Sequence, residues 1–159
     1  PVGLQIIYNL LEQEPSKSLF NKASKTQTGL ISRVPHASGI MDGSFTKDKV
    51  YSKDDHRSHR RQKWMEAGLD ARDDFGFLYD EEDRTIGQAA ILFPFAVANI
   101  CTVLPNFTTH EEIDEYTAVS ELPPLSNEEI SKIDSLWQEK HSTSLDQPFS
   151  NTQTKPTPS

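Results

Sequence analysis

Residues 29–43 read Gly29-Leu-Ile-Ser-Arg-Val-Pro-His-Ala-Ser-Gly-Ile-Met-Asp-Gly43, a short apolar run that leads into a loop with two glycines. The apolar part, residues 30–34, is typical of a buried strand. Because glycine has no Cβ, the backbone at Gly39 and Gly43 can approach a phosphate closely. Glycine also marks ordinary turns after strands, so this stretch allows either a phosphate loop or a plain strand-to-loop junction.

The segments around this stretch predict further strands and helices. Residues 4–9, LQIIYN, form a short apolar run that is typical of a buried strand, and residues 18–26 favour a helix. A third strand is expected at residues 99–104, after a helical segment at residues 85–93. Strands that alternate with helices in this way predict an α/β fold with a parallel sheet.

Three helix starts carry the capping-box pattern, in which a hydroxyl residue precedes Glu or Gln by three positions. The three hydroxyl residues are Thr85, Thr109 and Ser126. Pro94 should end the first of these helices near Phe93, because proline lacks a backbone N–H and clashes with the preceding turn.

Several motifs, in the same order and at consistent spacing, resemble those of the aldo-keto reductases, a family with an eight-stranded α/β barrel. Residues 4–9 resemble the sixth strand of that barrel, residues 33–43 the seventh strand with its following loop, and residues 102–106 the eighth strand. The resemblance covers about residues 2–137. It implies an α/β fold, a partial (β/α)8 TIM barrel with roughly the last three strands and their helices.

The resemblance also implies that the family's catalytic residues belong to earlier strands than those present here. A complete barrel of this kind needs about 250 residues, and the chain has 159. We therefore assign no residue to the family's tetrad of aspartate, tyrosine, lysine and histidine, and we expect the chain alone to be catalytically silent. Because the sequence starts at Pro1 in a strand-forming context, we interpret it as a partial sequence or the product of a truncated gene.

A cofactor-binding region is the part of the family's site that this sequence contains. The resemblance implies that Gln5 faces the nicotinamide carboxamide, that Arg33 lies where the family often stacks an aromatic ring on the nicotinamide, and that residues 34–39 hold the pyrophosphate. Without the resemblance, a hydrogen bond at a strand end or a surface ion pair is an alternative explanation for polar residues at positions 5 and 33. The expected cofactor-binding residues are Gln5, Arg33, Val34, Pro35, His36, Ser38, Gly39, Leu104, Pro105, Asn106, Thr108, Glu112 and Tyr116.

Two departures from the family pattern bear on the choice of cofactor. Asn106 and Thr108 stand where a glycine and a basic residue often follow strand eight. Glu112 replaces an arginine that clamps the ribose 2′-phosphate in many members, and Tyr116 replaces a frequent asparagine. A carboxylate repels a phosphate dianion, and at a helix N-terminus it takes the place of an anion. We therefore expect NAD(P)H binding with weak discrimination or a preference for NAD.

The composition argues against two classes of function. The chain has a formal net charge of −8, whereas general nucleic-acid binding needs a cationic face. The longest apolar stretch, residues 89–104, is interrupted by Pro94 and Asn99 and is too short to span a membrane. The single cysteine, Cys101, lies in an apolar strand and is expected to be a small buried side chain, which fits a cytoplasmic protein.

One basic segment departs from the acidic balance. Residues 53–63 contain five cationic residues and two histidines. We interpret the segment as a solvated loop and helix start, with an anion or nucleotide contact as the alternative. His56 and His59 have no third ligand at convincing spacing, so we expect no metal site.

We divide the chain into a barrel region at residues 1–140 and a disordered tail at residues 141–159, which has little to bury. The leading hypothesis is the cofactor-binding C-terminal part of an NAD(P)H-dependent aldo-keto reductase that reduces aldehydes or ketones when complete. Its partners would be a nicotinamide dinucleotide and a small carbonyl substrate. The alternative is a non-catalytic, stand-alone barrel remnant that acts by self-association or partner binding, because three strands leave open sheet edges.

Overall fold

The computed structural model describes residues 2–14, 16–80, 83–142 and 145. One parallel sheet contains the three predicted strands in the order β1-β2-β3, with β1 at Gly3–Ile7, β2 at Gly29–Arg33 and β3 at Ile100–Leu104. Ile31 of the central strand pairs with Gln5 on one side and with Thr102 on the other. The predicted parallel α/β arrangement is therefore confirmed.

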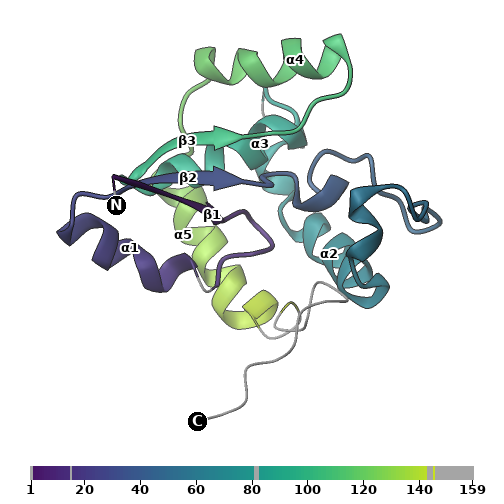
Figure 1. The fold of residues 1–159 in the computed structure, drawn as a ribbon, viewed down its shortest axis with the longest axis horizontal. Helices are drawn as coiled ribbons and strands as arrows, with labels where there is room; N and C mark the ends of the chain where they lie inside the picture. Colours follow the sequence, from purple (N-terminus) through teal and green to yellow (C-terminus); the bar gives the residue numbers. More distant parts are fainter. Residues whose placement is uncertain (1, 15, 81–82, 143–144, 146–159) are drawn as a thin grey trace.

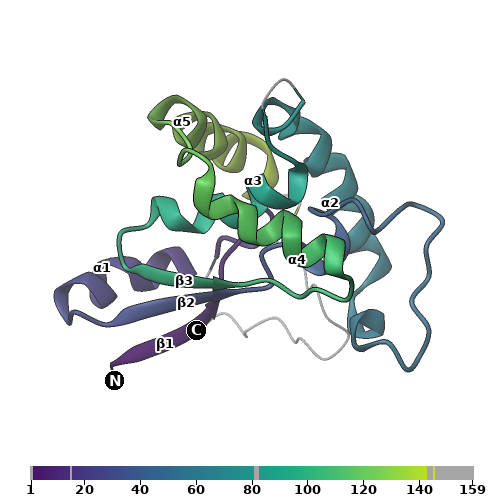
Figure 2. The ribbon, with the colours of Figure 1, turned by 90° about the horizontal axis from the view of Figure 1, so that it is seen from above.

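Helices connect the strands and cover one face of the sheet. Figures 1 and 2 show α1, α3 and α5 on the same side of the three strands. The α-helices of the described residues are α1 (Ser16–Lys25), α2 (Gln62–Asp74), α3 (Ile86–Leu92), α4 (His110–Thr117) and α5 (Asn127–Leu136). Short 3₁₀ turns lie at Ala37–Gly39, His56–His59, Gly76–Leu78, Phe93–Ala96 and Ala118–Glu121, and a π-helical turn lies at Trp137–His141.

The three predicted helix starts are confirmed. The hydroxyls of Thr85, Thr109 and Ser126 accept hydrogen bonds of 3.1, 3.2 and 3.2 Å from the backbone N–H three residues later. In each case the Gln or Glu at that later position accepts a hydrogen bond from the N–H of the capping residue, which completes the capping box. α3 also ends at Leu92, two residues before Pro94, as the sequence predicts.

The core lies between the covered face of the sheet and the helices. Just beyond β1, Tyr8 stacks on Phe93 with ring centroids 5.0 Å apart, and it meets Phe20 of α1 edge-on at 4.9 Å. Leu30 of the central strand and Ile133 of α5 are completely buried. The buried residues thus hold the helices against one face of the sheet.

Two expectations about the strands are wrong. β1 is not a buried strand: Gly3, Leu4 and Gln5 are exposed, and Ile6 is its buried residue. Cys101 is exposed rather than buried. Parallel sheets are commonly covered on both faces, but within the described part of the chain helices cover only one face, and β1 is an edge strand.

The division into a barrel region and a tail stays a prediction. Most of the predicted tail, residues 141–159, lies outside the described residues, while His141 and Leu145 within it are buried. Among the described residues, no helix has the length and apolar character that crossing a membrane requires.

Candidate functional site

A groove of about 1110 Å³ lies beyond the carboxyl ends of the strands. Gln5 and Ile7 of β1, the loop after β2 and the loop after β3 line it. In α/β barrels the loops at this end of the strands build the active site. Every predicted cofactor-binding residue except Tyr116 lines the groove, and Tyr116 packs against His36 with ring centroids 4.5 Å apart.

The loop after β2 contains consecutive residues in the left-handed conformation. Ala37, Ser38 and Gly39 have φ values of 47°, 63° and 99°. Non-glycine residues rarely adopt such values, and residues that do so cluster at ligand-binding loops. The turn is closed by the Gly39 N–H, which donates to the His36 carbonyl at 3.0 Å. Tight turns of this kind can direct backbone N–H groups into a concave anion site.

Gly39 lies under a second loop, residues 44–61, which we call the strap. A Cβ atom at residue 39 would lie 2.5 Å from Ser44 Oγ and 3.0 Å from Tyr51 Oη. Glycine is therefore needed here both for its positive φ and for the space that the strap occupies. The strap also contributes part of the groove lining, including Lys49, Asp55 and Arg57.

A buried polar network supports the loop after β2. Asn9 Nδ2 donates to the Val34 carbonyl at 2.8 Å and to Glu12 Oε2 at 2.9 Å. Arg60 Nη1 donates to Glu12 Oε1 at 2.8 Å, and Arg60 Nε donates to Ser38 Oγ at 2.8 Å. The side chains of Arg60 and Glu12 are only 3% and 6% exposed, so this ion pair is shielded from solvent.

The interpretation of the basic segment as a solvated loop is therefore wrong for Arg60, because the segment turns inward to meet Glu12. Arg57 is partly buried: it pairs with Asp55 at 2.7 Å and lies 4.2 Å from the ring centroid of Tyr51. The hydrogen bond from Arg57 holds the pKa of the Asp55 carboxyl well below its usual range. The segment places both carboxylates, including Asp55, and cations, including Arg57, in the groove lining, and the alternative, an anion or nucleotide contact, stays a prediction.

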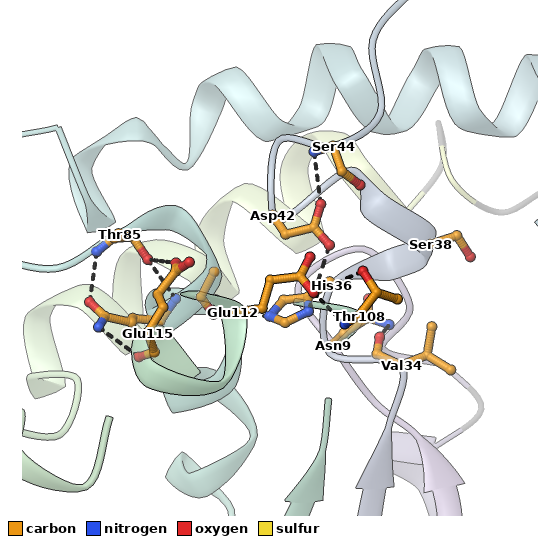
Figure 3. Close-up of polar contacts among 12 residues, drawn as sticks. Asn9, Val34, His36, Ser38, Asp42, Ser44, Thr85, Thr108, Glu112 and Glu115 are labelled. Carbon is orange, nitrogen blue, oxygen red and sulfur yellow. Dashed lines mark hydrogen bonds and ion pairs between the residues drawn. The ribbon is translucent and has the colours of Figure 1, made fainter. Parts of the chain in front are cut away.

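The other side of the groove begins at the α4 N-terminus. Glu112 Oε2 accepts a hydrogen bond from the backbone N–H of Thr108 (Figure 3). It accepts a second from the backbone N–H of Thr109. The hydrogen bond from the Thr108 N–H lowers the pKa of Glu112, so its carboxylate keeps its negative charge. A carboxylate thus occupies the positive end of this helix, where an anion would otherwise bind.

His36 joins the loop after β2 to two helices. Its Nε2 donates to the Gly87 carbonyl of α3 at 3.2 Å, and its ring packs on Tyr116 of α4. Its Nδ1 lies 3.8 Å from Asp42 Oδ2 (Figure 3). Burial lowers the pKa of His36 below its usual 6.5, although the Asp42 carboxylate and the Gly87 carbonyl oppose this shift. His36 is therefore a neutral structural link at neutral pH.

Gln5 and Arg33 share the uncovered face of the sheet. Gln5 pairs in register with Ile31, and Arg33 pairs with Ile7 and Leu104, so these side chains lie on one side of the strands. Both line the groove. The structure thus brings them next to the loop after β2, while their contacts with nicotinamide stay predictions.

Several residues that support the site were not predicted from the sequence. Asn9, Glu12 and Tyr51 carry contacts that support the loop after β2. Asn9 has a local signal, since its side chain accepts from the N–H groups of Leu11 and Glu12 in a turn that asparagine favours after a strand. The pairing of Glu12 with Arg60 has no such signal.

Within residues 2–14, 16–80, 83–142 and 145, no three His, Cys, Asp or Glu side chains converge as metal ligands would.

The family model "Aldo/keto reductase family" matches residues 1–138. A search of curated proteins gives no match.

The solved structures that resemble the chain are oxidoreductases with low sequence identity. The glycerol dehydrogenase of Gluconobacter oxydans has a TM-score of 0.68 and 19% identity, with 96% of this chain and 46% of that chain covered. The apo form of an aldo-keto reductase from Bacillus halodurans has a TM-score of 0.64 and 18% identity, with 85% and 43% covered.

The chain therefore spans less than half the length of these solved structures. Its three-stranded parallel sheet with helices matches part of their TIM-barrel fold, as the sequence predicts. The family model covers most of the 159 residues. The chain belongs to the aldo/keto reductase family.

Proposed function

We propose that this chain is the cofactor-binding part of an NAD(P)H-dependent aldo-keto reductase that reduces aldehydes or ketones. One observation carries the proposal: a single groove gathers the left-handed turn at residues 37–39, the loop after β3 and the exposed polar residues Gln5 and Arg33. One of the similar structures, the aldo-keto reductase of Bacillus halodurans, has also been solved in a holo form.

The groove residues fit a dinucleotide. A volume of about 1110 Å³ exceeds that of ordinary small-molecule pockets, which reach roughly 1,000 Å³. The turn at residues 37–39 would hold the pyrophosphate, and Gln5 with Arg33 would hold the nicotinamide end. Residues 104–108, Glu112 and Tyr116 would border the adenosine. When bound, the dinucleotide would supply the hydride for carbonyl reduction.

The chain's own residues would bind and orient the dinucleotide, and they would not transfer a proton to the substrate. The Gln5 amide offers both a donor and an acceptor to a carboxamide, and Arg33 offers a cation on the exposed sheet face. No residue of the chain is assigned as the proton donor to a carbonyl oxygen. We therefore propose that the 159 residues alone do not turn over carbonyl substrates, because a developing alkoxide would lack a proton donor. A cytoplasmic location also stays a prediction.

The charge at the α4 N-terminus bears on which dinucleotide is preferred. Glu112 uses its carboxylate to cap the helix and stays ionised. A ribose 2′-phosphate placed beside it would meet a like charge in a partly buried groove. We propose that the chain binds NADH at least as tightly as NADPH.

Isothermal titration of the 159-residue chain with NADH and with NADPH tests the proposal. We expect saturable binding of one dinucleotide per chain, with NADH at least as tight, and no consumption of NADH when an aromatic aldehyde is added. Absence of saturable binding would overturn the proposed function. Tight binding of NADPH alone would overturn the cofactor preference, and robust aldehyde reduction would overturn the assignment of no proton donor.

A second candidate function, self-association of a non-catalytic barrel remnant, has its own supporting observation. In the described part of the chain, β1 and β3 each pair on one side only. Leu4 and Leu104 are 41% and 44% exposed, and Phe107 is 54% exposed. Open strand edges with exposed apolar residues favour association. A stable oligomer without dinucleotide affinity, measured by sedimentation velocity and titration, would favour this second candidate over the first.

A further inference from the structure

We propose that Arg60 is a positioning residue for phosphate binding, which fixes the Ser38 hydroxyl so that its proton is directed at a phosphate oxygen of the bound dinucleotide. This inference rests on the proposed function, because it concerns the same groove. Arg60 borders the groove, but its side chain is only 3% exposed, and we propose that it acts through Ser38 rather than by touching the cofactor.

The chemistry of the Arg60–Ser38 contact sets the direction of the hydroxyl proton. Arg60 Nε donates to Ser38 Oγ at 2.8 Å. A guanidinium has donors and no acceptor, so the hydroxyl must be the acceptor in this bond and its own proton must point elsewhere. Ser38 lines the groove and is partly exposed there. The hydroxyl proton therefore remains available to donate to a ligand in the groove.

Arg60 is in turn held on two further sides. Its Nη1 and Nη2 donate to the two carboxylate oxygens of Glu12 at 2.8 and 3.3 Å. Its guanidinium lies 4.6 Å from the ring centroid of Trp64. A planar guanidinium can make these contacts together, whereas a lysine ammonium cannot reproduce the two-pronged pairing. The geometry of Ser38 thus depends on an arginine, and not only on a positive charge.

The strap fixes Ser38 at a second point. Tyr51 Oη donates to the Ser38 carbonyl at 2.7 Å. Burial raises the pKa of Tyr51, which keeps its phenol protonated and able to donate. Ser38 has a φ of 63°, a left-handed conformation that is strained for a non-glycine residue. Two hydrogen bonds from the strap, one to the carbonyl and one to the hydroxyl, hold this residue in its strained conformation.

The test compares dissociation constants for NADH and adenosine among Arg60→Lys, Ser38→Ala, the double variant and the control Arg72→Lys. Arg72 lies on α2 and pairs with Asp73, away from the groove lining. We expect Arg60→Lys and Ser38→Ala each to weaken NADH binding roughly tenfold, the effect of one lost hydrogen bond to a charged group. The double variant should bind no more weakly than Ser38→Ala, because both substitutions remove the same interaction. Adenosine, which lacks phosphates, should bind all four variants as it binds the unaltered chain.

The outcomes separate this inference from the proposed function. If the unaltered chain binds NADH and Arg60→Lys binds it equally well, or if the two effects add in the double variant, the positioning role is overturned while the proposed function stands. An equal loss of adenosine affinity would show a merely structural role and overturn the inference as well. If the unaltered chain binds no NADH, both proposals fail together.

Should Arg60→Lys not fold, Glu12→Gln takes its place. This substitution keeps Arg60 but weakens the pairing that aims its guanidinium at Ser38. We expect the same pattern, a loss of NADH affinity without a loss of adenosine affinity. Unchanged NADH affinity in a folded Glu12→Gln variant would overturn the inference.

Discussion

Gly39 shows at the scale of one residue why the loop after β2 needs its particular sequence. Its φ of 99° suits glycine alone, and the strap leaves no room for a Cβ atom. Gly43 has a φ of 75° but nothing lies within 4 Å of a Cβ built on it. Substitution of Gly43 would therefore cost stability through backbone conformation alone, whereas substitution of Gly39 would add a steric clash.

Gly39→Ala should destabilise the chain more than Gly43→Ala. We expect Gly43→Ala to lower the free energy of unfolding by about 1 kcal/mol, the cost of a left-handed alanine. Gly39→Ala adds a clash with Ser44 and Tyr51, so we expect a loss of about 2–3 kcal/mol. Urea unfolding of both variants measures the difference, and equal losses would show that the strap does not press on residue 39.

Glu112→Gln should raise the affinity for NADPH without changing that for NADH. Glutamine at this position can keep the capping box, as Gln88 does in α3, while the negative charge is removed. We expect NADPH to bind about threefold more tightly, in line with the energy of one partly exposed charge pair. Glu111→Gln, an exposed neighbour in the same turn, is the matched control. Equal effects of the two substitutions would point to net charge rather than to Glu112.

The stability of the chain should fall as the pH decreases below 6.5. Burial lowers the pKa of His36 below that value and also lowers the pKa of His141, so the unfolded chain binds more protons in this range. Each histidine contributes a slope of at most about 1.4 kcal/mol per pH unit. Well above pH 6.5, where the histidines of the unfolded chain have also lost their protons, both are neutral in either state and contribute no slope.

Urea unfolding at pH 8 and at pH 5.5 checks this dependence. We expect His36→Asn to reduce the loss of stability between the two pH values, with the remainder due to His141. Ser131→Ala, an exposed substitution that removes no titratable group, should leave the loss unchanged. An undiminished loss in His36→Asn would show that His36 does not titrate with folding.

At the scale of elements, sequence rules that involve neighbouring residues correctly predicted where helices begin and end. The capping boxes and the end of α3 before Pro94 depend on residues within three or four positions, and all of them occur as predicted. The exposure of β1 and of Cys101 was missed because it depends on what covers the sheet. The burial of Arg60 was missed because its partner Glu12 lies 48 positions away.

Ser126→Ala should destabilise α5 by removing its cap. The Ser126 hydroxyl accepts from the Glu129 N–H at 3.2 Å, and loss of such a cap costs about 1 kcal/mol. Ser131→Ala, at an exposed position within the same helix, should be neutral or slightly stabilising because alanine favours helix. Thermal unfolding of the two variants compares them, and a loss in Ser131→Ala as large as that in Ser126→Ala would argue against the capping role.

At the scale of the whole molecule, the structure gathers most of the predicted cofactor-binding residues into one groove. The order of strands and loops, read from short motifs, was sufficient to predict this gathering because parallel strands bring their carboxyl ends to one edge of the sheet. The strap and the network of Asn9, Glu12 and Arg60 could not be predicted in this way. They depend on side-chain packing between segments that are distant in sequence.

The most direct test of the central claim is an NMR titration of the ¹⁵N-labelled chain with NADH. If the groove binds a dinucleotide, saturable shifts should concentrate in the backbone amides of residues 34, 36–39, 104 and 106–109, while the amides of α5 stay unchanged. Shifts centred on α5, or no saturable shifts at all, would contradict the assignment of this groove as the cofactor site.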